Sequence, residues 1–292
     1  MVTSLDIQPL AGSCFGATVR GVELATLDRD RETVEAIAAA WVEHGLLIFP
    51  GQHLTIDEQN TFARRFGSLE FRAAPISNID SNGNTRSDPD DDIVKSLRGN
   101  EGWHHDSTYM PLQAKGAVFT AEIVPAEGGD TGFADMRAAY DALDDATRDQ
   151  IHDLSAHHSL YYSMGRAGYL PTASEDGSYA LYGYHDKEVS LRSLVYVHPD
   201  TGRPNLRIGR HAHDIPGMDP TASEALIDQL NADAVADPAR VHFHSWTPGD
   251  AILWDNRRLM HCGTPFDMSQ PRRMWHTRIA GEPATELASN HR

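Results

Sequence analysis

The stretch WHHDSTYM occupies residues 103–110 and contains the pattern His104-x-Asp106. In a strand, side chains two positions apart lie on one face, so an imidazole and a carboxylate at this spacing can bind one metal ion from one side. Two ligands leave most of the coordination sphere open, so a third must come from elsewhere in the chain. The stretch therefore predicts a metal site that joins distant parts of the fold.

The third ligand is expected at His261, which follows the apolar run AILW at 251–254. Two histidines and one carboxylate on one face of a metal are typical of non-haem Fe(II) oxygenases. The chain has 16 histidines, so a His-x-Asp pair also arises by chance, and a hydrogen-bonded surface or core histidine is the alternative. His105 is expected to point away from the metal.

Length and charge limit the possible partners. The chain has 292 residues, enough for a substantial core, and 25 Lys and Arg against 42 Asp and Glu give a net charge of −17. Nucleic acid and anionic membranes are therefore poor partners for it. An anionic small-molecule substrate needs a local basic pocket.

Cysteine use and hydropathy suggest the compartment. Cys14 and Cys262 are too few for a disulfide framework, and no apolar run approaches the roughly 18 residues of a membrane span. The N-terminal residues lack the pattern of a signal peptide. We expect a cytoplasmic protein that does not enter the membrane.

Hydrophobic periodicity predicts an α+β fold whose core is a sandwich or jelly-roll. Helices are expected at 28–44, 55–66, 136–154 and 221–230. Strands are expected as two short segments within 5–24 and at 46–49, 116–124, 206–210, 239–244, 250–255 and 274–280. No linker interrupts the chain, so we expect one domain over residues 1–292.

Two segments lack a clear period. Residues 70–100 are rich in Ser, Asn, Gly and Pro and include the acidic run SDPDDD at 87–92, which predicts a mobile lid loop rather than a calcium site. Residues 156–200 are rich in His, Tyr and Gly and are expected to form an insertion that packs near the site.

The C-terminal strand carries three arginines in the run PRRMWHTRIAG at 271–281. If the strand is regular, Arg272, His276 and Arg278 share one face, and Arg273 lies on the other. Two arginines that face a metal could hold two carboxylates, because the guanidinium fork matches a carboxylate. The alternative is that both are surface cations on an edge strand.

Four separated motifs resemble one family in order along the chain. They are WHxD at 103–106, GGDT at 128–131, WDNR at 254–257 with His261, and the arginine-rich final strand. Together they resemble the Fe(II)/2-oxoglutarate-dependent dioxygenases of the taurine and phenoxyalkanoate family. Segments 106–111, 133–143, 208–213 and 274–278 resemble its branch that cleaves (S)-2-phenoxypropionate-type herbicides. The resemblance implies a double-stranded β-helix (jelly-roll) core with flanking helices.

The resemblance also implies that the protein uses Fe(II) as cofactor and 2-oxoglutarate and O2 as cosubstrates, and that ascorbate helps the reaction in vitro. It further implies the roles of individual residues. No catalytic side chain is expected beyond the metal centre. The implied iron ligands are His104, Asp106 and His261. Thr131 and Arg272 are implied to bind 2-oxoglutarate, or Arg273 if the register slides by one. Arg210, Arg278 and Asn100 are implied to bind substrate.

The implied reaction is hydroxylation of a C–H bond of a small carboxylate, an aryloxyalkanoate of the (S)-phenoxypropionate or phenoxyacetate type, followed by ether cleavage to a phenol and an oxo acid. Taurine, an alkyl sulfate or another small acid is the alternative substrate, although His276 replaces the sulfonate-binding arginine of the taurine enzymes. A zinc hydrolase and a non-catalytic metal-binding protein are alternatives from other classes. The resemblance further implies a homo-oligomer.

Overall fold

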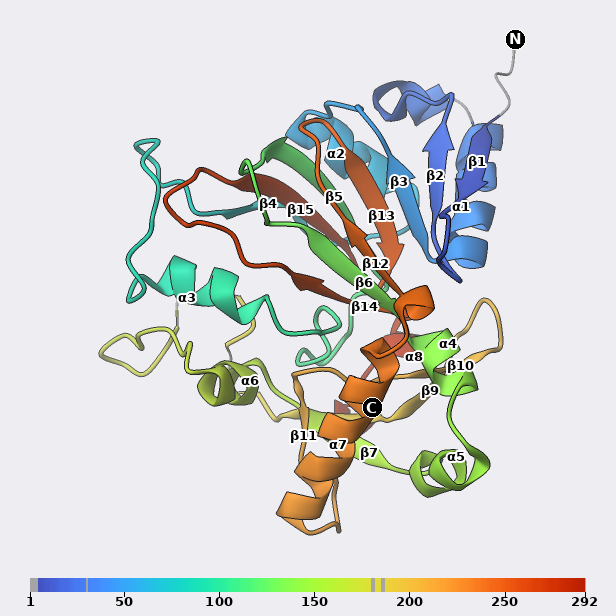
Figure 1. Ribbon diagram of the computed structural model, residues 1–292, viewed down its shortest axis with the longest axis vertical. Coiled ribbons are helices and arrows are strands. Elements are labelled where there is room, and N and C mark those ends of the chain that lie inside the picture. The colour runs from blue at the N-terminus through green and yellow to red at the C-terminus, as the bar shows by residue number, and fades with distance from the viewer. Residues whose placement is uncertain (1–4, 30, 180–181, 185–186, 292) are drawn as a thin grey trace.

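The computed structural model describes residues 5–29, 31–179, 182–184 and 187–291. Figure 1 shows a large twisted sheet in one half of the molecule and several helices and short strands in the other half. No helix among these residues is both long and apolar enough to cross a membrane.

The large sheet has seven strands in the order β1-β2-β3-β13-β5-β15-β4. All neighbours are antiparallel except β2 and β3, which are parallel. The strands are β1 (Asp6–Pro9), β2 (Ala17–Arg20), β3 (Leu46–Phe49), β4 (Leu69–Ser77), β5 (Gly116–Ile123), β13 (Ala251–Asp255) and β15 (Arg273–Ile279).

A smaller antiparallel sheet faces the large one and completes the predicted jelly-roll core. Its strands are β12 (Val241–His244), β6 (Thr131–Asp135) and β14 (Leu259–Gly263), in this order. Phe133 and Leu259 of the small sheet share one hydrophobic cluster with Ile252 and Trp254 of the large sheet. The space between the sheets is therefore apolar and fixes their separation.

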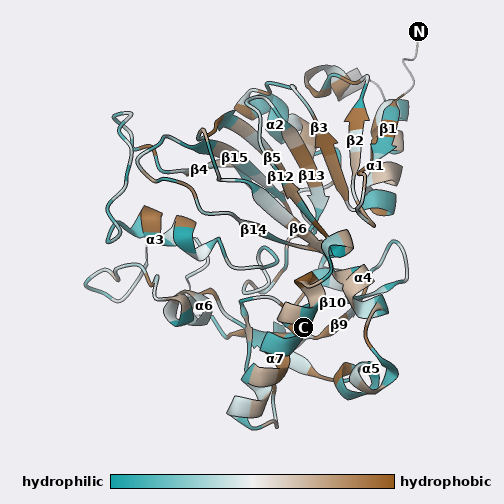
Figure 2. Cartoon of the chain, viewed as in Figure 1, coloured by the Kyte–Doolittle hydropathy of each residue, from teal (hydrophilic) through white to brown (hydrophobic). Residues whose placement is uncertain are grey.

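Two helices cover the outer face of the large sheet: α1 (Arg31–His44) contacts β3 and β13, and α2 (Ile56–Ala63) contacts β4, β5 and β15. On β3, Leu47 and Phe49 pack in the cluster under these helices, and Leu46 and Ile48 pack between the sheets. The strand is buried on both faces, which explains its continuous apolar run. Figure 2 shows this band of hydrophobic strands.

The other half of the molecule contains most of the remaining elements around a third hydrophobic cluster. Its helices are α3 (Asp92–Gly99), α4 (Met136–Asp141), α5 (Asp145–Ile151), α6 (Leu160–Ala167) and α7 (Pro220–Val235). Its small sheets are β11-β7-β8 and β10-β9, made by β7 (Ser155–His158), β8 (Ser190–Ser193), β9 (Val195–Val197), β10 (Pro204–Leu206) and β11 (Ala212–His213). The remaining short helices are η1 (Leu24–Arg29), η2 (Pro238–Arg240), α8 (Pro283–Glu286) and η3 (Ser289–His291).

Several expected elements are present with small shifts in their ends. The helix predicted at 28–44 is α1, although residue 30 lies outside the described residues, and Gly45 follows it with a φ of 74°. Thr55 caps α2 as expected, in a capping box with Glu58. The helix predicted at 221–230 is the longer α7.

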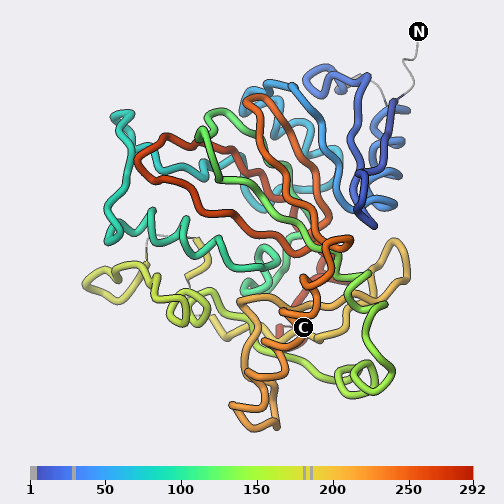
Figure 3. Tube along the Cα trace, in the orientation of Figure 1, coloured from blue at the N-terminus to red at the C-terminus, as the bar shows by residue number. Residues whose placement is uncertain are grey.

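The prediction of a loop over 70–100 is wrong in large part. Residues 69–77 form β4, which pairs with β15 at the edge of the large sheet, and residues 92–99 form α3, capped by the Asp91 side chain. Pro75 and the half-buried pattern of β4 hide the strand, since an edge strand tolerates proline and need not alternate. Figure 3 shows the chain leaving the sheet after β4 and running along its edge to α3.

Three other predictions need correction. The helix predicted at 136–154 is divided into α4 and α5, because Asp144 caps a new helix. The strand predicted at 206–210 overlaps β10 only at Leu206, where β10 ends, and Gly209 then turns with a φ of 110° against the backbone of His104. The strand β14 was not predicted at all.

A buried ion pair joins the end of β6 to the turn between β13 and β14 and predicts a large stability effect. Arg258 donates to both carboxylate oxygens of Asp135, at 3.1 and 2.6 Å, and to the Glu43 carbonyl at 2.9 Å. Arg258→Ala leaves the buried Asp135 charge without its partner, which costs about 3–5 kcal/mol of unfolding free energy. Urea unfolding measures this cost.

The matched control is Arg72→Ala, which removes an exposed ion pair with Asp57. Its expected cost is below about 1 kcal/mol. Equal losses in the two variants would contradict the structural role of the Arg258–Asp135 pair.

Candidate metal centre and adjoining cavities

A short backbone bridge brings His104 next to His261. The His104 amide donates to the His261 carbonyl at 2.9 Å, and the His261 amide donates to the His104 carbonyl at 2.8 Å. His261 lies in β14, so the bridge extends the small sheet by one residue. The two imidazole rings lie 4.2 Å apart between centroids.

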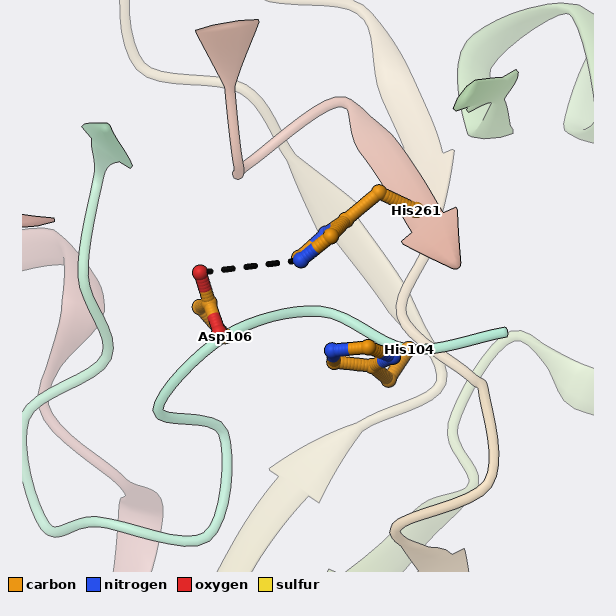
Figure 4. A group of neighbouring side chains, drawn as sticks. All are labelled: His104, Asp106 and His261. Atoms are coloured by element: carbon orange, nitrogen blue, oxygen red, sulfur yellow. Dashed lines mark ion pairs between the residues drawn. The ribbon is translucent and has the colours of Figure 1, made fainter. Parts of the chain in front are cut away.

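The three predicted ligands come together at this bridge (Figure 4). His104, Asp106 and His261 each offer one ligand atom, and these atoms lie within 4.8 Å of one another. The His261 Nε2 atom is 3.7 Å from the Asp106 Oδ2 atom. This is the only such group of three among the residues that the structure describes, so the acidic run at 87–92 forms none.

Asp106 reaches the group from a turn, which corrects the expectation that the His-x-Asp pair lies on a strand. Ser107, the next residue, has a φ of 56°. The Asn256 side chain holds the turn, because its Oδ1 accepts from the Asp106 amide at 2.7 Å and its Nδ2 donates to the Asp106 carbonyl at 2.9 Å. Asn256 therefore sets the direction of the carboxylate.

The ligand side chains are held in protonation states that suit a metal. The Nδ1 of His104 lies 2.7 Å from the Gly102 carbonyl, which can only accept, so Nδ1 carries the proton and Nε2 is free. Burial lowers the pKa of His104 and lowers that of His261 to about 4. Burial alone would raise the pKa of Asp106, but the adjacent Arg278 holds it well below its usual range.

The Asp106 carboxylate shows that the group fits a cation. Its Oδ2 atom is buried without a hydrogen-bond partner in the described structure, on the side that faces His261. An unpaired anionic oxygen is costly to bury, and a divalent metal satisfies it. The three side chains are thus able to hold a metal ion by one face.

Two cavities meet at this group. The inner cavity runs from the ligands to Thr131 and Arg272 between the two sheets. The outer cavity, of about 390 Å³, runs toward Phe71, Met164, Tyr184 and Arg210. The two share a boundary of side chains that includes Asn100, His104, Asp106, His276 and Arg278. The outer volume is that of a small-molecule site.

Arg272 lies in the inner cavity and Arg273 does not. Arg272 is buried and donates to the Gly129 carbonyl at 3.1 Å, its Nε has no partner in the described structure, and burial lowers its pKa to about 10. Arg273 pairs with Glu122 on the outside, at 3.3 Å. The side chains of β15 therefore alternate as the sequence predicts.

Thr131 lines the same inner cavity. Its hydroxyl oxygen accepts from the Trp246 Nε1 at 3.0 Å, which leaves the hydroxyl proton able to donate into the cavity. Nothing in the sequence around Trp246 indicated this contact.

Arg210 and Asn100 meet in the outer cavity, 3.4 Å apart between Nη2 and Oδ1. Arg210 also lies 3.3 Å from the Met164 sulfur, and its Nε has no partner in the described structure. Burial lowers the pKa of Arg210 to about 10. The Arg210 guanidinium is thus a cation in the outer cavity that forms no ion pair with a carboxylate of the described residues.

Arg278 occupies a different setting at the boundary of the two cavities. It donates to Asp106 Oδ1 at 2.5 Å, and to the Ser107 hydroxyl at 3.0 Å. His276 lies beside it, with its Nε2 3.3 Å from Asp106 Oδ2 and its ring stacked on Trp254. The sequence predicted that both residues face the metal, but not that Arg278 binds a ligand side chain.

Three further residues lie around the centre. His105 points away from the ligands, as expected, and donates from Nδ1 to the Asn256 carbonyl at 2.8 Å. Cys262 is buried beside the inner cavity, and burial raises its pKa to about 12, so it is a thiol at neutral pH. His211 packs against His104 and Tyr109.

Arg192 is a structural residue that sequence reasoning missed. Fully buried, it donates to the carbonyls of Thr108, Met110 and Glu286, at 2.6, 2.6 and 2.9 Å. These bonds fasten the turn that carries Asp106 to the C-terminal segment. No local pattern signals such a role, because each acceptor is a backbone carbonyl.

Comparison with known proteins agrees with this site. The model of the taurine catabolism dioxygenase TauD, TfdA family matches residues 6–278. The chain is 56% identical to the (S)-phenoxypropionate/alpha-ketoglutarate-dioxygenase of Sphingobium herbicidovorans over 100% of both chains. It is 52% identical to the enzyme of the same name from Delftia acidovorans over 99% of both.

A solved structure extends the comparison to three dimensions. The crystal structure of AAD-2 in complex with Mn(II) and N-oxalylglycine superposes with a TM-score of 0.87 and 34% identity, covering 95% of this chain and 97% of that one. The family match disfavours the zinc hydrolase and the non-catalytic protein. The chain belongs to the taurine catabolism dioxygenase TauD, TfdA family of Fe(II)- and 2-oxoglutarate-dependent oxidoreductases.

Proposed function

We propose that the protein is an Fe(II)/2-oxoglutarate-dependent oxygenase that hydroxylates an aryloxyalkanoate of the (S)-2-phenoxypropionate or phenoxyacetate type. One observation carries the proposal: a His-Asp-His group lies where two cavities meet, and each cavity contains an arginine without a carboxylate partner in the described structure, the buried Arg272 and the half-buried Arg210. Each such arginine favours an anionic ligand. The proposed reaction uses two anionic ligands, 2-oxoglutarate and the substrate acid.

His104, Asp106 and His261 are proposed to hold the iron. Bound iron with 2-oxoglutarate supplies the oxidation of a C–H bond by O2, with release of succinate and carbon dioxide. The protein binds and orients the two acids and limits the access of water. The burial of the ligand side chains serves this exclusion.

The inner cavity is proposed to bind 2-oxoglutarate. Arg272 offers its unpaired Nε–H, and Thr131 offers its hydroxyl proton, to the distal carboxylate. The AAD-2 structure supports this role, because N-oxalylglycine has the same two carboxylates at the same spacing. Arg273 is not required, since it lies on the outer face of β15.

The outer cavity is proposed to bind the substrate. Arg210 and Asn100 form a polar end for a carboxylate, and Phe71, Leu97 and Met164 form an apolar wall for an aryl group. Hydroxylation of the carbon beside the ether oxygen gives a hemiketal or hemiacetal, which collapses to a phenol and an oxo acid. The identity to the two (S)-phenoxypropionate enzymes supports this substrate over taurine or an alkyl sulfate.

We further propose that the protein works in the cytoplasm as a homo-oligomer. Two unpaired cysteines and the need to keep iron ferrous support the compartment. The expectation about a signal peptide concerned residues 1–4 in part, and these lie outside the described residues. Light scattering after size exclusion is expected to give a multiple of the 32.2 kDa chain mass, and the monomer mass would contradict the oligomer.

The first experiment measures oxygen uptake, succinate and phenol with Fe(II), ascorbate and 2-oxoglutarate. The panel contains both enantiomers of 2-phenoxypropionate, phenoxyacetate, taurine and an alkyl sulfate. We expect the (S)-phenoxypropionate to stimulate turnover most and to release phenol, and a chelator or His261→Ala to abolish turnover. Turnover that no member of the panel stimulates would overturn the proposed substrate class. A lack of iron-dependent turnover would overturn the proposed oxygenase activity.

Two adjacent arginines give a matched test of the 2-oxoglutarate site. Arg272→Gln is expected to raise the KM for 2-oxoglutarate by roughly 10- to 100-fold, because a charge-assisted hydrogen bond in a dry cavity is worth about 1.5–3 kcal/mol. Arg273→Gln removes the same charge one residue away on the outer face. We expect the KM of this variant for 2-oxoglutarate to stay within about twofold of the wild type. An equal rise in KM in the two variants would contradict the assignment of Arg272 to the 2-oxoglutarate site.

A further inference from the structure

The resemblance of the chain to its family gave Arg210 and Arg278 the same task, but their surroundings differ. Arg278 is already paired: its Nη2 donates to Asp106 Oδ1 at 2.5 Å, and its Nη1 lies 3.0 Å from the Ser107 hydroxyl and 3.4 Å from the Tyr109 hydroxyl. Of its donor nitrogens, Nε alone has no partner in the described structure. The Arg278 guanidinium therefore has few N–H donors left to bind a substrate carboxylate.

A second carboxylate lies close to the same guanidinium. Glu70 accepts from the Ser107 hydroxyl at 2.9 Å and from the Tyr182 hydroxyl. Ser107 therefore links Arg278 to Glu70, while Asp106 contacts Arg278 directly. A substrate carboxylate at Arg278 would be a third anion beside one cation, which like-charge repulsion disfavours.

Aromatic rings also cover Arg278. Its guanidinium carbon lies 5.1 Å from the centre of the Phe71 ring and 5.5 Å from the centre of the Tyr182 ring. Both rings line the outer cavity beside the guanidinium, which also borders that cavity. Arg278 is thus held in place from several directions.

Arg210 has the opposite surroundings. Its contacts are neutral, to Asn100 and to the Met164 sulfur, and no ion pair joins it to a carboxylate within the described ranges. It is the arginine of the outer cavity that lacks a counter-charge. Burying a cation without a partner is costly, and an anionic ligand removes that cost.

The two oxygens of Asp106 show what Arg278 does instead. Arg278 binds Oδ1, and Oδ2, which has no hydrogen-bond partner in the described structure, faces His261 at 3.7 Å and His276 at 3.3 Å. Asn256 holds the backbone of Asp106 but does not contact its carboxylate. His276 Nε2 lies 3.3 Å from Oδ2 without a hydrogen bond to it in the described structure, so the hydrogen bond from Arg278 sets the rotation of the carboxylate. A fixed partner of this kind orients a metal ligand.

We propose that Arg278 is a positioning residue that turns one oxygen of Asp106 toward the metal, and that Arg210 receives the substrate carboxylate. The second half rests on the proposed function. The first half concerns only the metal centre.

The first test compares Arg278→Lys with Arg210→Lys, since both keep the charge and lose the fork. Calorimetry measures the affinity for Mn(II) without 2-oxoglutarate or substrate. Arg278→Lys is expected to bind Mn(II) at least tenfold more weakly than the wild type, and Arg210→Lys within twofold of it. A thermal melt confirms that each variant is folded, and Arg278→Met serves if the lysine variant is not.

The second test uses (S)-2-phenoxypropionate and its primary amide, which have similar size and differ in charge. The ratio of kcat/KM for acid and amide is expected to fall at least tenfold in Arg210→Met, to recover in part in Arg210→Lys, and to stay within about threefold of the wild type in Arg278→Lys. Direct binding of the two probes gives the same ratio without turnover.

Two results would overturn the proposal. Mn(II) affinity that is unchanged in Arg278→Lys, or lowered equally in Arg210→Lys, removes the positioning role. A loss of acid preference in Arg278→Lys as large as that in Arg210→Met assigns the carboxylate to Arg278. If the wild type neither binds nor turns over the acid, the proposed substrate and the role of Arg210 fall, while the Mn(II) comparison still decides the role of Arg278.

Discussion

The reciprocal pair of backbone hydrogen bonds between His104 and His261 is the constraint on which the site depends. It fixes two residues far apart in the chain at one position on the end of the small sheet, so both imidazoles enter the same space. The turn after His104 then brings Asp106 to the third position, and Asn256 and Arg192 hold that turn through backbone groups. Ligand geometry is therefore a product of main-chain pairing more than of side-chain packing.

Charge is distributed unevenly in this acidic protein. The net charge is −17, yet the cavities beside the ligands contain three buried or nearly buried arginines. One of them pairs with Asp106, and the other two contact only neutral groups among the described residues. A carboxylate that enters either cavity gains a desolvated cation, where its attraction is stronger than at the surface.

Local patterns predicted the parts of the fold that local chemistry controls. The capping box at Thr55, the buried strand β3 and the alternation of Arg272 and Arg273 all follow from short-range spacing. The strand β4 was missed because its single partner at the sheet edge places few demands on its sequence. The three ligands were predicted as a group, whereas the contacts of Arg278, Asn256 and Arg192 were not, because each depends on a chain segment that spacing cannot place.

The two cavities share side chains near the ligands and differ in the walls that lie away from them. Strands of the jelly-roll supply Thr131, Trp254 and Arg272 to the inner one, while α6 and the segment after it supply Leu160, Met164, Tyr182 and Tyr184 to the outer one. Changes in length or sequence in that segment can reshape the outer wall without disturbing a strand register. The fold thus separates the wall of the outer cavity, which can change with the substrate, from the inner cavity, which the shared chemistry requires.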